Sequence, residues 1–152
     1  MLIREAQPAD VPQLMAVRLA VLENRLTRPE LITAAHYLQY LTQRGKGWVA
    51  EAAGGIVGFA VVDLTGHNIW ALFLHPDHAG RGIGRALHDT MLSWYFRQTT
   101  EPVWLGTAPG TRAERFYRQA GWRALGPQAD GEVRFEMRAD EWSGPNNVVM
   151  PK

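Results

Sequence analysis

A glycine-rich turn with two arginines is the part of this 152-residue chain whose residue types and spacing most clearly allow chemistry. Its glycines and arginines are Gly80, Arg81, Gly82, Gly84 and Arg85. An apolar segment typical of a buried strand, 69–74, precedes the turn, and apolar residues at helical spacing follow it from Ile83. A strand, a glycine turn and a helix in that order expose backbone N–H groups at the positive end of a helix dipole. The turn is therefore predicted to bind a phosphate or a pyrophosphate.

A dinucleotide-binding turn is the alternative interpretation of these glycines. Its pattern, Gly-x-Gly-x-x-Gly, requires a third glycine where counting from Gly82 places Leu87. An acidic partner for a ribose is also expected after the next strand, and the apolar segment 103–105 is not closed by one. The sequence disfavours a dinucleotide site.

Two motifs carry a resemblance to a known family. Segment 79–84, Ala-Gly-Arg-Gly-Ile-Gly, resembles the acyl-CoA pyrophosphate loop of the GCN5-related N-acetyltransferases (GNAT), whose pattern is Gln/Arg-x-x-Gly-x-Gly/Ala. Ala79 departs from the first position, but that loop holds phosphate mainly through backbone N–H groups. Segment 113–122, Ala-Glu-Arg-Phe-Tyr-Arg-Gln-Ala-Gly-Trp, resembles the family's later Ala-x-x-Phe-Tyr-x-x-x-Gly-Phe motif. The resemblance covers about residues 3–138.

The resemblance implies that acetyl-CoA lies on the glycine turn with its pantetheine arm along the preceding strand. A backbone N–H of that strand would polarise the thioester carbonyl, an oxyanion contact typically worth ~3 kcal/mol of barrier. The cofactor contacts that it implies are Leu72, Phe73, Leu74, Gly80, Arg81, Gly82, Ile83, Gly84 and Arg85. An additional contact to the 3′-phosphate of CoA is expected from among Arg112, Arg115 and Arg118.

The resemblance also places Tyr117 at the tyrosine that protonates the departing CoA thiolate. The chemistry is reasonable, because a thiol of pKa ~8.5 leaves more readily when a phenol of pKa ~10 can donate a proton. We therefore predict that Tyr117 is the general acid. The alternative is a helix tyrosine that packs beside Phe116 with its hydroxyl at the surface.

A general base is not evident in the sequence. An alkylamine of pKa ~10.4 must lose a proton near neutral pH, which costs ~4–5 kcal/mol. Where many relatives have a glutamate this chain has Trp70 and Leu105, and Gly110 stands in place of a frequent asparagine. The remaining candidates, each acting through water, are His67, Asp63 and Glu51. His67 has the most suitable intrinsic pKa, and an acceptor that arrives deprotonated would need no base.

Two further groups of polar residues have weaker interpretations. Asn24, Arg25 and Arg28 lie between the first two predicted helices, where this family usually meets its acceptor, and are the predicted substrate contacts. His75 and His78 could suggest a metal pair, but Pro76 lies between them and the turn is committed to phosphate. We predict no metal.

Composition excludes several classes of protein. A net charge of +1 argues against a nucleic-acid binder. With no cysteine, the chain has no disulfide and no cysteine nucleophile. No apolar run approaches the ~18 residues of a membrane span, and the N-terminus lacks a signal-peptide core. The prediction is a soluble, cytoplasmic protein without membrane or nucleic-acid partners.

Strand and helix patterns alternate without the strict rhythm of a doubly wound sheet, so the predicted class is α+β, or mixed α/β. Helices are predicted over about 12–22, with Asp10 as N-cap, and over about 29–43, 83–97 and 112–120. Strands are predicted over 2–4, 48–51, 56–64, 69–74, 103–107, 122–125 and 132–138, with a turn at 44–47. The resemblance implies a mostly antiparallel, twisted sheet of six to seven strands with about four helices. We expect one domain, 1–142, and a loose tail, 143–152.

Together with these observations, the resemblance implies an acetyl-CoA-dependent N-acetyltransferase, and we expect it to act on a small primary amine. Direct transfer is expected, since no cysteine is available to carry the acetyl group. The alternatives are a non-catalytic acyl-CoA-binding or regulatory module, and an acetyltransferase for protein N-termini or lysines. A homodimer is an expectation from the family alone.

Overall fold

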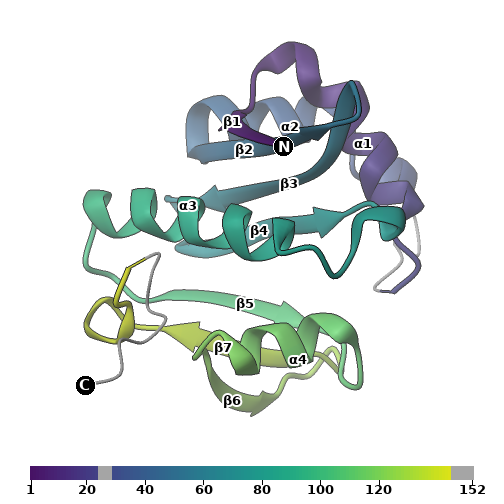
Figure 1. The fold of residues 1–152 in the computed structure, drawn as a ribbon. Helices are drawn as coiled ribbons and strands as arrows, with labels where there is room; N and C mark the ends of the chain where they lie inside the picture. Colours follow the sequence, from purple (N-terminus) through teal and green to yellow (C-terminus); the bar gives the residue numbers. More distant parts are fainter. Residues whose placement is uncertain (24–28, 145–152) are drawn as a thin grey trace.

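The structure, a computed structural model, describes residues 1–23 and 29–144 (Figure 1). One seven-stranded sheet has the order β1-β2-β3-β4-β5-β7-β6. The strands are β1 (Leu2–Glu5), β2 (Gly45–Ala52), β3 (Gly55–Asp63), β4 (Asn68–Leu74), β5 (Val103–Thr107), β6 (Arg123–Pro127) and β7 (Val133–Met137). The α-helices are α1 (Val11–Ala20), α2 (Ala34–Gln39), α3 (Ile83–Gln98) and α4 (Arg112–Gln119). The predicted class and sheet are confirmed; the predicted tail lies almost entirely outside the described residues.

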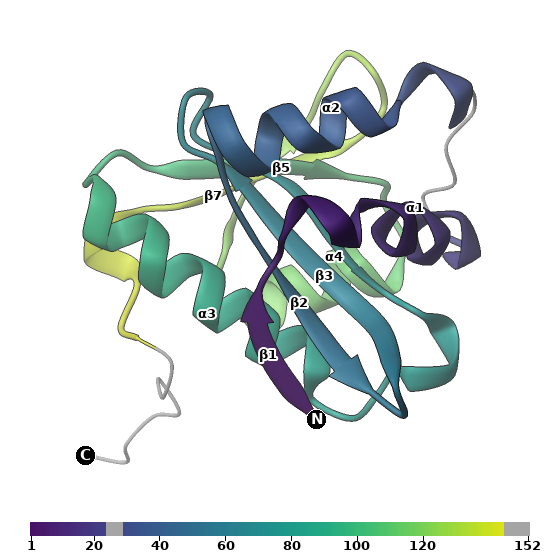
Figure 2. The same cartoon turned by 90° about the horizontal axis from the view of Figure 1, so that it is seen from above.

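Helices cover both faces of the sheet, and each face has its own core. Leu87 and Met91 of α3 are fully buried together with Val62 of β3 and Phe135 of β7. On the other face, Leu14 of α1 packs in a second cluster with residues of α2, β2, β3 and β4. Figure 2 shows α1 and α2 on one side of the strands and α3 on the other. The helical spacing predicted after the glycine turn thus corresponds to the buried face of α3.

Strands β4 and β5 are the only parallel neighbours in the sheet of the described chain, and they pair at one position. That position, Asn68 opposite Trp104, lies at the start of both strands. From there the strands diverge toward their carboxyl ends (Figure 1). Because β4 continues to Leu74 and β5 to Thr107 without further pairing, the sheet opens between them.

A β-bulge in β4 lies beside this opening. Val61 pairs with Ala71 and Val62 with Ile69, so Trp70 is an extra residue on β4. A bulge redirects the side chain that it carries and increases the local twist. Here it places Trp70 against the stacked ring of Tyr40, 4.2 Å away between ring centroids.

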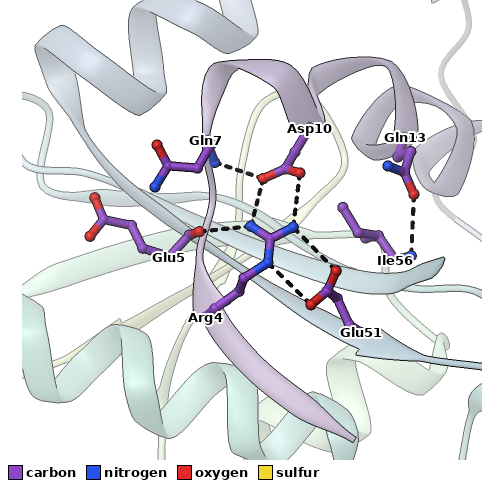
Figure 3. Close-up of polar contacts among 7 residues, drawn as sticks. All are labelled: Arg4, Glu5, Gln7, Asp10, Gln13, Glu51 and Ile56. Atoms are coloured by element: carbon purple, nitrogen blue, oxygen red, sulfur yellow. Dashed lines mark hydrogen bonds and ion pairs between the residues drawn. The ribbon is translucent and has the colours of Figure 1, made fainter. Parts of the chain in front are cut away.

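A polar network joins β1 and β2 to the turn before α1 (Figure 3). The guanidinium of Arg4 donates two hydrogen bonds, of 2.9 and 3.0 Å, to the carboxylate of Asp10, and its Nε lies 3.2 Å from Glu51. Asp10 also accepts the N–H of Gln7 at 2.7 Å. Asp10 is the N-cap residue of α1, as predicted, but its carboxylate makes no cap bond to that helix. The buried carboxylate instead stabilises the preceding turn and the sheet edge.

Two predicted boundaries are wrong. The predicted helix 29–43 contains a short 3-10 turn, then α2 after the N-cap Thr33, and then a π-helical turn over 40–44. The predicted turn 44–47 belongs largely to β2, where Gly45 pairs with Asp63. A side chain at Gly45 would lie 1.8 Å from the backbone oxygen of Val62. This position requires glycine because β2 and β3 lie too close together for a side chain, and not because the chain turns here.

Candidate functional site

The glycine turn has the backbone form that its sequence predicts. Gly80 and Gly82 both have φ of 79°, in the left-handed region that favours glycine, and Gly82 is the N-cap of α3. A Cβ at Gly80, Gly82 or Gly84 would meet no atom within 4 Å. Open space therefore faces the backbone at the positive end of a 16-residue helix.

A cleft runs from this turn to α4, and we call it the cofactor cleft. The predicted cofactor contacts that line it are Leu72, Phe73, Leu74, Gly80, Gly82, Gly84 and Arg85. Arg81 is exposed at its edge and does not line it, and the side chain of Ile83 is buried in the core. Only the backbone of Ile83 is therefore available to a ligand.

The arginines near the cofactor cleft differ in whether they line it and in whether they pair with a carboxylate. Arg112 and Arg115 line the cleft. Arg118 does not, because its guanidinium lies 2.9 Å from Glu114 and over the ring of Phe135. Arg85 is ion-paired with Asp89 at 3.1 Å, one helical turn further on. Of the three arginines considered for the 3′-phosphate, Arg112 and Arg115 are thus the two in position to contact a ligand in the cleft.

A second cleft occupies the opening between β4 and β5, and we call it the β4–β5 cleft. Its polar and aromatic lining includes Arg18, Trp70, Tyr117 and Glu132. Four residues line both clefts: Leu72, Phe73, Ala113 and Tyr117. The two clefts therefore meet beside Tyr117.

Two backbone N–H groups of β4 at this junction do not pair with β3. The N–H of His75 donates to Val57 on β3 at 2.7 Å. Because backbone groups alternate in direction along a strand, the N–H groups of Leu72 and Leu74 point away from β3, toward the open side of β4. These amides face the junction from the strand side.

Tyr117 is held firmly by the aromatic rings around it. It is 7% exposed and contacts the rings of Trp122 and Phe135, with centroids 5.4 and 6.1 Å away. Burial raises the pKa of Tyr117 well above its ordinary value of 10. The hydroxyl therefore remains protonated at neutral pH, as a proton donor must.

None of the base candidates from the sequence lines either cleft. His67 lies at the opposite end of β4 from the glycine turn, and its Nδ1 is 2.9 Å from the hydroxyl of Tyr95. Asp63 is ion-paired with Arg44 at 2.7 Å. Glu51 belongs to the Arg4 network at the sheet edge. Each has a structural partner, and the structure brings none of them to Tyr117.

The carboxylate that does line the β4–β5 cleft is Glu132, which the sequence interpretation did not consider. It lies in the turn between β6 and β7, next to Asp130. Burial, and secondarily the charge of Asp130, raise the pKa of Glu132. The sequence did not indicate Glu132 as a site residue, because it lies in a polar turn outside both motifs. Only the strand order β5-β7-β6 brings this turn next to β5.

The remaining predictions concern acceptor and metal contacts. Asn24, Arg25 and Arg28 lie outside the described residues. His75 and His78 lie with ring centroids 6.1 Å apart, and Nδ1 of His75 accepts the N–H of Asp77. In residues 1–23 and 29–144 no three His, Cys, Asp or Glu side chains are grouped to hold a metal ion. Within the same residues no helix is long and apolar enough to cross a bilayer.

Several solved structures are similar to this chain. No curated protein matches the chain by sequence. Among solved structures, the PaiA N-acetyltransferase of Thermoplasma acidophilum, solved with coenzyme A, is 14% identical with a TM-score of 0.76 over 90% of this chain and 98% of its own. A GNAT-family acetyltransferase from Staphylococcus aureus is 19% identical with a TM-score of 0.77 over 91% and 98%. The ribosomal-protein-alanine N-acetyltransferase of Brucella melitensis is 24% identical with a TM-score of 0.71 over 91% and 99%.

These solved structures share the fold. The family itself is shown by sequence, because the model of the acetyltransferase (GNAT) family matches residues 14–122, well over half of the chain. The chain therefore belongs to the GNAT family of acetyl-CoA-dependent N-acetyltransferases.

Proposed function

We propose that this protein transfers the acetyl group of acetyl-CoA directly to the primary amine of a small molecule, in a ternary complex. The observation that carries the proposal is the meeting of the two clefts beside Tyr117. Acetyl-CoA enters along the cofactor cleft, and the acceptor enters along the β4–β5 cleft. The thioester then lies at the junction, with the amine on one side and the phenol on the other.

The cofactor cleft suits the parts of acetyl-CoA. The diphosphate accepts hydrogen bonds from backbone N–H groups between Gly80 and Arg85, at the positive end of α3. The pantetheine arm follows the open edge of β4, where the N–H of Leu72 or Leu74 polarises the thioester carbonyl. Tyr117 donates its proton to the departing thiolate.

The β4–β5 cleft suits an amine that carries an apolar portion. Trp70 and Phe73 supply aromatic surface, and Glu132 supplies a carboxylate that attracts an ammonium group. The guanidinium of Arg18 lies 4.1 Å above the ring of Phe73, so a positive charge stands on the α1 side of the cleft. The two charges on different elements favour an acceptor that is oriented by charge as well as by shape.

An acceptor screen tests the proposal. Acetyl-CoA is mixed with the protein and with a panel of alkylamines, polyamines, amino acids and aromatic amines, and free thiol is followed with time. We expect thiol release with at least one small amine and the corresponding N-acetyl product by mass spectrometry. Binding of acetyl-CoA without turnover of any amine contradicts the proposal and favours the non-catalytic module.

A protein N-terminus is the second candidate acceptor. Two similar structures are ribosomal-protein-alanine N-acetyltransferases, from Escherichia coli and Brucella melitensis. An α-amino group of pKa ~8 is also easier to deprotonate than an alkylamine. Short peptides that begin with alanine therefore belong in the same screen. Turnover of these peptides with indifference to all small amines would establish this candidate in place of the first.

A further inference from the structure

We propose that Glu132 is the general base that removes the proton from the acceptor ammonium. The inference deepens the proposed function, on which it rests, and it assigns the role that no residue in the two sequence motifs fills. It places the acid and the base on two different elements that line one cleft. Tyr117 lies on α4, and Glu132 lies on the turn that leads into β7.

The position of Glu132 is set by a glycine on the neighbouring strand. A methyl group at Gly106 of β5 would lie 2.7 Å from Oε1 of Glu132 and 2.8 Å from Nε2 of Gln128. The missing side chain therefore leaves the space in which the carboxylate lies over β5. The turn itself is fixed, because the N–H of Gln128 donates to the backbone oxygen of Glu132 at 2.7 Å. The backbone of Glu132 is therefore fixed at the cleft, and its side chain extends over β5.

The surroundings of Glu132 make its carboxylate a better proton acceptor than an exposed glutamate. Burial and the nearby charge of Asp130 both raise the pKa of its carboxyl. A base is most effective when its pKa approaches the working pH. The other charged or titratable side chains that line the β4–β5 cleft are Arg18 and Tyr117. Arg134 follows on β7, and its guanidinium lies over the ring of Trp104.

The proton balance of the reaction is complete with these two residues. The acceptor ammonium gives one proton to the Glu132 carboxylate, and the free amine attacks the thioester carbonyl carbon. A C–N bond forms, the C–S bond breaks, and the thiolate takes the proton of Tyr117. The nitrogen then loses its second proton, which restores the phenol, and the proton held by Glu132 leaves to solvent. The products are the amide, CoA thiol and one released proton.

Glu132→Gln is the direct test, because the amide keeps the size of the side chain and cannot accept the proton. Glu136→Gln is the matched control, since Glu136 lies on the same face of β7 and outside the cleft. For an alkylamine found in the screen, we expect Glu132→Gln to lower kcat/KM by about 100-fold or more, with unchanged acetyl-CoA affinity. The defect should shrink at high pH and with a weakly basic amine, which need no base. The control should stay within about threefold of wild type.

Gly106→Ala provides a second, independent variant. The methyl group displaces the ends of two flexible side chains without removing the carboxylate. We expect a folded protein with unchanged melting temperature and a kcat/KM for the alkylamine that is lowered about tenfold or more. A melting temperature that falls together with activity would mean that the turn has a structural role.

The outcomes separate the two proposals. If the wild type acetylates an alkylamine and Glu132→Gln is equally active, the base assignment is overturned and the proposed function stands. If the loss in Glu132→Gln is the same at every pH and for every amine, Glu132 is not the base. If the wild type binds acetyl-CoA and acetylates nothing, both the proposed function and the assignment of Glu132 as the base are contradicted.

Discussion

The indole N–H of Trp122 donates a 2.9 Å hydrogen bond to Nε2 of the fully buried His88. Because Nε2 accepts, the proton of the neutral imidazole is on Nδ1, 2.8 Å from Oδ1 of Asp89. Asp89 is in turn ion-paired with Arg85 beside the glycine turn. The network connects the second sequence motif to the start of α3.

His88 makes stability depend on pH. Burial, the dominant cause, lowers the pKa of His88 below its ordinary value of 6.5. The unfolded chain therefore binds a proton below about pH 6.5 that the folded chain excludes, and stability falls as pH decreases through this range. We expect a loss of up to about 1.4 kcal/mol per pH unit in chemical unfolding. His88→Gln should flatten this slope, and an unchanged slope would contradict the assignment.

Tyr117→Phe tests the general acid. The variant retains the buried ring but has no proton to give, so we expect kcat to fall by about 100-fold or more while acetyl-CoA affinity is unchanged. Tyr95→Phe is the control, since Tyr95 is also buried but bonds to His67 away from both clefts. The control should lose some stability and keep kcat. Equal kcat in wild type and Tyr117→Phe would remove Tyr117 from the mechanism.

Gly84→Val tests the cofactor cleft. No atom lies within 4 Å of a Cβ at this position, so the fold tolerates the side chain, which projects into the space proposed for the diphosphate. We expect acetyl-CoA affinity, measured by calorimetry, to fall about tenfold or more, or ~1.4 kcal/mol. Gly55→Val has equal space at the start of β3, outside the cleft. Affinity should fall only in the first variant; a fall in both would indicate a general effect on the fold.

Asp10→Ala tests the polar network in Figure 3. The change leaves the N–H of Gln7 without its acceptor and Arg4 with Glu51 as its remaining carboxylate, so we expect a loss of about 1–3 kcal/mol in urea unfolding at neutral pH. Glu51→Ala removes a more exposed partner of the same arginine and should cost about 1 kcal/mol or less. If both variants were as stable as wild type, the network would not contribute to stability.

Local sequence patterns predicted the fold well where the structure depends on residues close together in the chain. The apolar strand, the glycines with positive φ and the buried face of α3 all follow from spacing within a few residues. The predicted boundaries of helices and strands are wrong where contacts between residues distant in the sequence determine them. The turn predicted at Gly45 is wrong because Gly45 lies in β2, against the backbone of Val62 on β3.

The sequence motifs predicted residues that the structure places along one cleft, but they gave no carboxylate for the β4–β5 cleft. The glycine turn and Tyr117 lie in short motifs, and the structure brings them to one cleft. The divergence of β4 from β5 and the position of Glu132 depend on the order of strands in the sheet. No local pattern contains that order, which is why His67 was the best available base candidate from the sequence.

A crystal structure of the protein with CoA and an acceptor amine from the screen tests the central claim most directly. We predict the diphosphate on the backbone N–H groups between Gly80 and Arg85, the sulfur within hydrogen-bond distance of the Tyr117 hydroxyl, and the amine between the sulfur and Glu132. CoA bound away from the glycine turn, or a sulfur directed away from Tyr117, would contradict the account.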